Sequence, residues 1–95
     1  MIVNFASVTI DSVSRTAIPA QVDCSVVTVR NADTTNDATL YGAATGGTGV
    51  TLGAGQSRTF RPQAGSRQLS WRADETVVWA QAAAGTGPIE VECLR

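Results

Sequence analysis

The feature that most constrains this chain is a two-residue alternation of apolar and polar side chains, interrupted at short intervals by glycine, proline and asparagine. It is clearest near the end of the chain, where Ile89, Val91 and Cys93 alternate with Glu90 and Glu92. Side chains at i and i+2 share one face of a β-strand, so this pattern predicts a strand with one buried and one solvated face. No segment shows helical periodicity. The sequence therefore predicts an all-β chain in which helices are scarce.

Eight short segments carry strand patterns, and turn residues separate them. They cover residues 3–10, 24–30, 39–43, 50–52, 57–61, 67–73, 76–83 and 88–94. Ninety-five residues suffice for one domain. We therefore expect residues 1–95 to form a single small β-sandwich, jelly-roll or immunoglobulin-like, with seven or eight short and mostly antiparallel strands. A small closed barrel is the alternative architecture.

Two turns lead to specific expectations about strand pairing. Segment 53–56, Gly-Ala-Gly-Gln, predicts a tight hairpin, because glycine adopts the positive φ angles that such turns require. A two-residue turn at 74–75 would place Trp71 and Trp79 on opposite sheet faces, whereas a three-residue turn would bring both into one core. The register stays open at this point. A tryptophan left on the surface would mark a partner-binding patch.

The composition argues against catalysis and against bound cofactors or metals. The chain has no histidine, which removes the usual acid–base residue and the commonest metal ligand. The glycine-rich loop 42–49 lacks the Lys-Ser/Thr of a phosphate-binding loop. Asp33, Asn36 and Asp37 do not match a calcium-binding loop and are explained by turn formation. We expect no enzyme, no cofactor and no metal site.

The basic residues are all arginine and are concentrated in one segment, although codon bias would also explain the lack of lysine. Segment 58–72 carries a charge of +4 and includes two aromatic side chains, a combination that is also found on surfaces that bind nucleic acid. The net charge of the chain is -1, and the overall basic field of a nucleic-acid-binding domain is absent. A contact with an acidic protein surface, or pairing with acids across strands, is the better interpretation.

Cys24 and Cys93 are the two cysteines, and each lies in a strand-like apolar segment. A disulfide between them would close a loop of about 70 residues. The N-terminal segment does not read as a secretory signal, which favours reduced, buried thiols, but both states stay open. No apolar stretch approaches the roughly 18 residues of a membrane-spanning helix, so we expect no membrane association.

The stretch from Val27 to Phe60 has a recognisable order: an apolar strand ending Val-Arg-Asn, a polar loop, Leu-Tyr-Gly, a Gly/Thr loop and then Val-Thr-Leu-Gly-Ala-Gly-Gln-Ser-Arg-Thr-Phe. It resembles small virion proteins of tailed phages, namely capsid decoration (cement) proteins and head-fibre modules. Their β-sandwiches commonly carry a similar Leu-x-x-Gly-x-Ser turn. The resemblance covers about one third of the chain and rests on a hairpin signature.

This resemblance implies a noncatalytic virion protein that binds the phage shell and stabilises it. The implied partner is the major capsid protein or another virion protein, and the implied location is the virion, assembled in the host cytoplasm. A homo-oligomer, dimer or trimer, would fit a symmetric shell. The alternative is a receptor- or glycan-binding module of a tail or head fibre. The candidate partner-binding residues are Tyr41, Arg58, Arg61, Arg72, Trp71 and Trp79.

Overall fold

The computed structural model describes residues 2–62 and 70–95, with side chains from residue 4 onward. Every regular element in these ranges is a β-strand. The strands are β1 (Ile2–Asp11), β2 (Thr16–Pro19), β3 (Val26–Asn31), β4 (Ala38–Tyr41), β5 (Val50–Leu52), β6 (Ser57–Phe60), β7 (Thr76–Ala82) and β8 (Thr86–Leu94).

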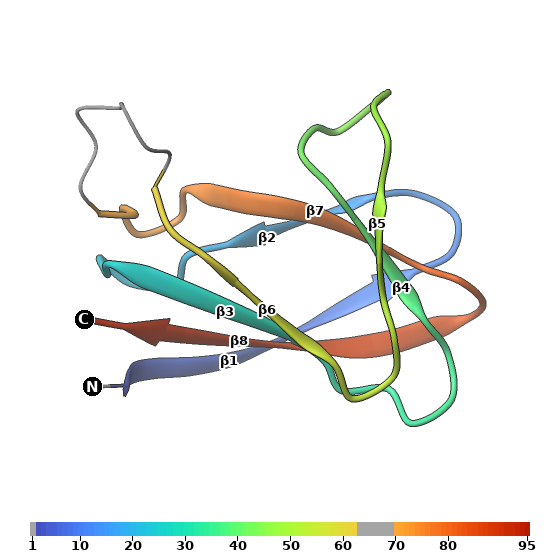
Figure 1. Ribbon diagram of the computed structural model, residues 1–95, viewed down its shortest axis with the longest axis horizontal. Helices are drawn as coiled ribbons and strands as arrows, with labels where there is room; N and C mark the ends of the chain where they lie inside the picture. Colours follow the sequence, from blue (N-terminus) through green and yellow to red (C-terminus); the bar gives the residue numbers. More distant parts are fainter. Residues whose placement is uncertain (1, 63–69) are drawn as a thin grey trace.

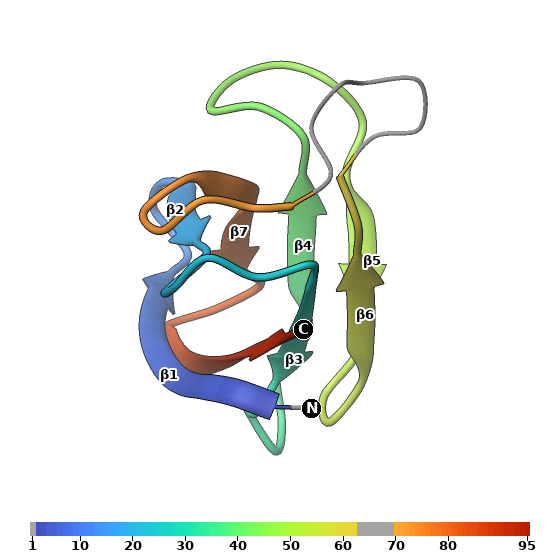
Figure 2. The ribbon, with the colours of Figure 1, turned by 90° about the vertical axis from the view of Figure 1, so that its left-hand side faces the viewer.

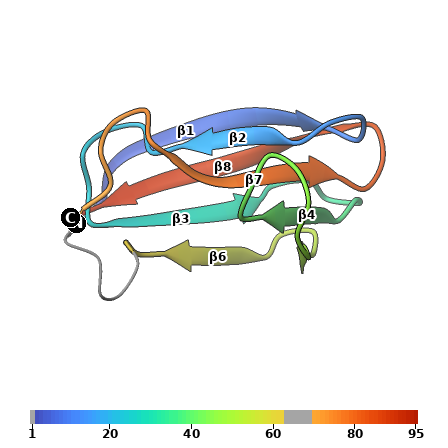
Figure 3. The ribbon, with the colours of Figure 1, turned by 90° about the horizontal axis from the view of Figure 1, so that it is seen from above.

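The strands form two antiparallel sheets, which confirms the predicted all-β sandwich (Figures 1 and 3). The strand order is β1-β8-β3-β6 in sheet A and β2-β7-β4-β5 in sheet B. Only β4 and β5 are both consecutive in the chain and paired, so nearly every connection passes from one sheet to the other. The edge strands β1 and β2 lie on one side of the molecule, and β5 and β6 lie on the opposite side (Figure 2).

The core follows the alternation seen in the sequence. On β8, Ile89, Val91 and Cys93 are fully buried, whereas Glu90 is exposed and Glu92 half-buried on the other face. Burying each large aliphatic side chain contributes about 1.5–3 kcal/mol relative to leaving it in water. The same alternation buries side chains from other strands of both sheets: Ile10, Ile18, Val27, Val29, Leu40, Leu52, Val78, Ala80 and Ala82.

The predicted hairpin at residues 53–56 is wrong. β5 pairs with β4 in sheet B, where Leu52 lies opposite Ala38. β6 pairs with β3 in sheet A, where Ser57 lies opposite Arg30. The 53–56 turn therefore carries the chain from one sheet to the other, because glycine permits a tight reversal without specifying which strands pair after it.

The buried side chain of Asn31, at the end of β3, fixes this crossover. Its Nδ2 donates hydrogen bonds to the carbonyls of Asn36 and Leu52, at 2.9 and 3.0 Å. Its Oδ1 accepts one from the backbone N–H of Asp33 at 3.1 Å. Its backbone N–H and carbonyl bind the 53–56 turn at 2.8 and 2.7 Å. One buried amide thus joins the end of β3, the following loop and the crossover.

The strand predicted at 67–73 also differs from the structure. Residues 67–69 lie outside the described residues, and 70–73 contain only an isolated bridge between Trp71 and Cys24. Neither of the two registers considered for Trp71 and Trp79 occurs. The reason is that the backbone N–H groups of Trp71, Ala73 and Asp74 donate hydrogen bonds to segment 20–24, so these residues do not fold back on β7.

The structure has a strand that the sequence analysis did not predict, β2 (Thr16–Pro19). It has four residues and ends in Pro19, and it pairs with β7 at the edge of sheet B. An edge position tolerates proline because no neighbour on the open side needs its missing N–H. β2 was missed because its residues, Thr-Ala-Ile-Pro, show no clear alternation of polar and apolar side chains.

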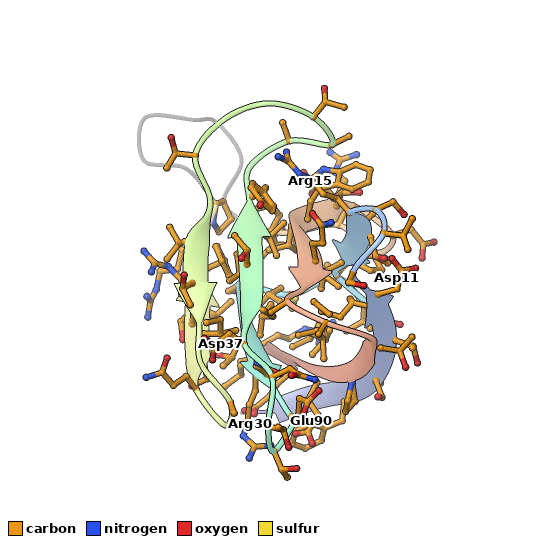
Figure 4. The ribbon with its side chains drawn as sticks, turned by 90° about the vertical axis from the view of Figure 1, so that its right-hand side faces the viewer. Asp11, Arg15, Arg30, Asp37 and Glu90 are labelled. Carbon is orange, nitrogen blue, oxygen red and sulfur yellow. The ribbon has the colours of Figure 1, made fainter. Side chains whose placement is uncertain are left out.

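The outward face of sheet A is polar. Arg30 and Glu90 form an ion pair across β3 and β8, with 3.3 Å between Nη1 and Oε2 (Figure 4). Both side chains are 47 % exposed, so the pair contributes less than about 1 kcal/mol. Beside it, the Thr28 and Thr59 hydroxyls are 3.1 Å apart. This cross-strand ion pair is made by an arginine that lies outside segment 58–72.

Candidate binding groove

A groove of about 200 Å³ lies where β6 of sheet A faces sheet B. It combines residues from the consecutive strands β4, β5, β6 and β7, which belong to both sheets. Its lining is largely apolar and aromatic, which is typical of sites that receive a side chain of a partner. The lining residues are Leu40, Tyr41, Gly42, Thr48, Val50, Arg58, Phe60, Val77 and Val78.

Arg58 is the charged residue among those that line the groove, and it lies opposite Val29 on the face of β6 that is turned toward sheet B. Among the described residues, its guanidinium makes no hydrogen bond, ion pair or ring contact. An unpaired guanidinium beside an apolar surface is suited to a carboxylate or a main-chain carbonyl of a partner. Tyr41 and Arg58, both predicted from the sequence as partner-binding residues, therefore lie in one site.

The loop that borders the groove, residues 42–49, is held by Arg15. Arg15 lies in the connection between β1 and β2, at the end of the molecule opposite Arg30 and Glu90 (Figure 4). Its Nη1 donates hydrogen bonds to the carbonyls of Ala43 and Gly46, at 2.9 and 2.7 Å. Its guanidinium lies 3.4 Å from the centroid of the Tyr41 ring. We call Arg15, Tyr41 and the 42–49 loop the Arg15 latch.

Gly49 closes the latch against sheet B. A Cβ atom at this position would overlap the Thr39 side chain and would lie 2.7 Å from Cε1 of Tyr41. The close approach of the loop to the Tyr41 ring therefore requires glycine at position 49. The 42–49 loop is therefore held at its base by Arg15 and by the close packing at Gly49.

The other predicted partner-binding residues do not line the groove. Trp79 is half-buried on the outward face of sheet B, with Ala17 and Tyr41 as its cross-strand neighbours. Trp71 packs against the core, and its Nε1–H donates a hydrogen bond to the Phe60 carbonyl at 3.3 Å.

Arg61 and Arg72 are exposed outside the groove. Of the three predicted shell-facing arginines, only Arg58 is part of the site. These three arginines thus do not form one patch in the groove.

Sequence reasoning missed Arg15, Val50 and Phe60. Val50 is 44 % exposed, which is unusual for a valine next to a core strand. Phe60 carried a weak signal, because it lies between two arginines. Arg15 carried none, since its partners lie 28 and 31 residues away and only the fold brings them together.

Cys24 and Cys93 are both free and buried. Burial and a hydrogen bond with the Cys93 thiol raise the pKa of Cys24 to about 11. A thiol with a raised pKa forms little of the reactive thiolate near neutral pH. The structure therefore agrees with the buried-thiol interpretation of this pair.

The crowded acids near residue 33 belong to a turn. Oδ1 of Asp33 accepts hydrogen bonds from the backbone N–H groups of Thr35 and Asn36, at 2.9 and 3.2 Å. These bonds lower the pKa of the Asp33 carboxyl below its ordinary value. Within the described residues, no three His, Cys, Asp or Glu side chains gather at a point where they would bind a metal ion.

Among the residues described, no helix has the length and apolar character needed to cross a bilayer. No protein-family model matches the chain. Comparison with curated proteins gives no significant match. Comparison with solved structures gives none either.

Proposed function

We propose that the protein is a noncatalytic virion structural protein, a capsid decoration or cement protein that attaches to a phage shell and stabilises it. The observation that carries attachment is the groove, in which Leu40, Val50 and Phe60 form an apolar surface beside Arg58, whose guanidinium has no partner among the described residues. The assignment to a virion comes from the sequence resemblance over residues 27–60.

The chemistry of the groove defines the feature that it would bind. An apolar side chain of the shell protein would enter between Val50 and Phe60, and a neighbouring carboxylate would pair with Arg58. A single site of about 200 Å³ is small, so each contact would be weak. Repetition over a symmetric shell, and a homo-oligomeric state of the protein, would raise the overall affinity.

The proposed partner is the major capsid protein or another virion protein. Nucleic acid and membranes have no part in this proposal, and the protein would be incorporated during assembly in the host cytoplasm. The order of the Arg15 latch supports attachment, because a groove wall that is already positioned loses less conformational entropy on binding.

A receptor- or glycan-binding module of a phage fibre is the alternative function. Sugar binding by aromatic residues requires an open ring face. Arg15 already covers one face of the Tyr41 ring at 3.4 Å, and Trp79 is half-buried. These contacts favour a protein partner over a glycan.

The test is binding to purified phage shells that lack the protein. The wild type should sediment with the shells and raise the temperature at which they release their subunits. Arg58→Glu should weaken binding at least tenfold, because it reverses the charge in the groove. Arg72→Glu, an equal charge change at an exposed position outside the groove, should leave binding within about twofold.

Three outcomes would contradict the proposal. Shells that neither bind the wild type nor gain heat resistance would exclude the cement function. Loss of binding in Arg72→Glu but not in Arg58→Glu would show that attachment uses another surface. Specific binding on a glycan array that Trp79→Ala abolishes would favour the fibre alternative.

A further inference from the structure

The edge of sheet A formed by β1 is long and unprotected. β1 runs for ten residues and pairs only with β8 among the described strands. The sequence from position 2 to position 10, IVNFASVTI, contains no charge and no proline. Between residues 4 and 10, no backbone hydrogen bond to the described residues is found on the side away from β8. Such an edge exposes unpaired N–H and C=O groups that can pair with another strand.

The other three edge strands differ from β1 in ways that hinder pairing. β2 has four residues and ends in Pro19, β5 has three residues, and β6 has four residues with Arg58 among them. Short edges, proline and charge are the usual means by which proteins block pairing between sheets. Of the edges that the structure describes, β1 alone is long and free of proline, and its one charge, Asp11, lies at its end.

We propose that β1 is the self-association edge of this protein, which pairs antiparallel with β1 of a second copy. The two sheets A would then form one continuous sheet of eight strands around a two-fold axis. A second copy is the fitting partner because residues 4–10 carry no charge, so two copies of this segment meet without like-charge repulsion. This inference identifies the surface through which the homo-oligomer of the proposed function would form. It does not depend on whether the protein binds a phage shell.

The alternation of side chains along β1 determines the register in which the β1 strands of the two copies would pair. The register of β1 is irregular between Ile2 and Asn4 and regular from there to Asp11. A two-fold axis at Ser7 would pair residues 4–10 of both copies and keep Asp11 outside. Phe5, which is 62 % exposed, would then lie opposite Thr9 of the second copy and cover its methyl group.

The charges next to β1 permit this pairing. Glu90 and Glu92 on β8 lie beside Ser7 and Phe5 in the sheet. In the dimer, the two β8 strands would be separated by three strand spacings, about 14 Å. This separation exceeds the screening length of about 8 Å at physiological ionic strength, so the acidic side chains of the two copies would repel each other weakly.

The experiment is sedimentation equilibrium of the full chain over a range of concentrations, combined with hydrogen exchange of the peptide that covers residues 4–10. We expect the wild-type mass to rise toward twice the monomer mass with concentration. The backbone of β1 should exchange more slowly at high concentration. The double variant Ser7→Lys/Thr9→Lys should weaken dimerisation at least tenfold, because the lysines at position 7 would face each other across the axis.

The matched control is Ser57→Lys/Thr59→Lys. It places two lysines at the same spacing on the outward face of β6, the opposite edge of the same sheet, and should leave the dimer unchanged. Phe5→Ser gives a second test if the double lysine variant does not fold, and it should also weaken the dimer. The proposal is overturned if the wild type stays monomeric at about 1 mM. It is equally overturned by a dimer that the β6 variant disrupts and the β1 variants do not.

Dimerisation and shell binding can fail independently. The β1 variants leave the groove residues intact, and Arg58→Glu leaves β1 intact. A dimer that does not bind shells would retain this inference and refute the proposed function.

Discussion

The 42–49 loop and the 53–56 turn are both rich in glycine and flank the short strand β5, but the fold holds them in opposite ways. The 53–56 turn is fixed from inside by Asn31, whose side chain is 2 % exposed. The 42–49 loop is fixed from outside by Arg15, through two carbonyl contacts and the ring of Tyr41. One connection is anchored in the core, and the other is anchored at the surface.

Because of this difference, the two connections should contribute to different properties: the 53–56 turn to the stability of the fold, and the 42–49 loop to the attachment of a partner. The partners of a buried amide have no water to replace it, so losing that amide costs the full desolvation of the groups left behind. An exposed guanidinium competes with water for the same carbonyls, so losing it costs little free energy but frees the loop. We therefore expect changes at the Asn31 end to lower stability and changes at the Arg15 end to alter the groove wall.

The largest effect is expected for Asn31→Ala. It leaves the carbonyls of Leu52 and Asn36 without their donor and should lower the free energy of unfolding by about 2–4 kcal/mol in urea titration. Asn31→Asp is the matched control for shape. Its free energy of unfolding should fall by nearly as much, because a carboxylate cannot donate a hydrogen bond to these carbonyls. A loss below about 1 kcal/mol in both variants would contradict the role given to Asn31.

Gly49→Ala should have the next largest effect. Its methyl group would overlap Thr39 and Tyr41, and we expect a loss of about 1–3 kcal/mol in thermal or urea unfolding. Gly42→Ala lies in the same loop with no atom within 4 Å of the added carbon, and it should change stability by less than about 0.5 kcal/mol. Equal effects of the two substitutions would show that the loop does not pack closely on Tyr41.

Arg15→Gln should change stability by no more than about 1 kcal/mol. Hydrogen exchange in residues 42–49 should nevertheless become several-fold faster, because two carbonyl contacts and the contact with Tyr41 are lost. Arg30→Gln is the control, since it removes an exposed arginine contact at the other end of the molecule. Unchanged exchange in Arg15→Gln would refute the latch.

The smallest expected effects are on the stability at acidic pH. They compare Asp33, near Asn31, with Asp11, near Arg15. The backbone N–H groups of Thr35 and Asn36 lower the pKa of Asp33. Those of Ser14 and Val13 lower the pKa of Asp11, near the latch. Because both pKa values are lower in the folded state, their contribution to stability is present above the ordinary value of 3.8. It is lost as pH falls through the lowered values.

Asp33→Asn and Asp11→Asn should each flatten the acid part of the stability curve, measured by urea unfolding between about pH 5 and pH 2. Each variant should differ little from the wild type at neutral pH, because the amide oxygen still accepts the turn bonds. A variant with an unchanged acid slope would show that its carboxyl has the same pKa in the folded and unfolded states.

The parts of the fold that follow from local pattern were predictable. The alternation around Val91 gave a strand and its buried face, and the spacing of turn residues gave the all-β class. Tyr41 and Arg58 were two of the six candidate partner-binding residues, and both line the groove. The pairing of β5 and β6 was not predictable, because their flanking turn is compatible with a hairpin or a crossover.

By itself, the sequence of this protein determined which residues form strands over most of the chain and which side of each strand faces the core. Both follow from the two-residue period of side chains along an extended backbone. Only the tertiary structure decided which strands are neighbours, because that choice depends on hydrogen bonds between distant residues. Asn31 with Leu52, and Arg15 with Gly46, are contacts of this kind, and no local pattern in the sequence encodes them.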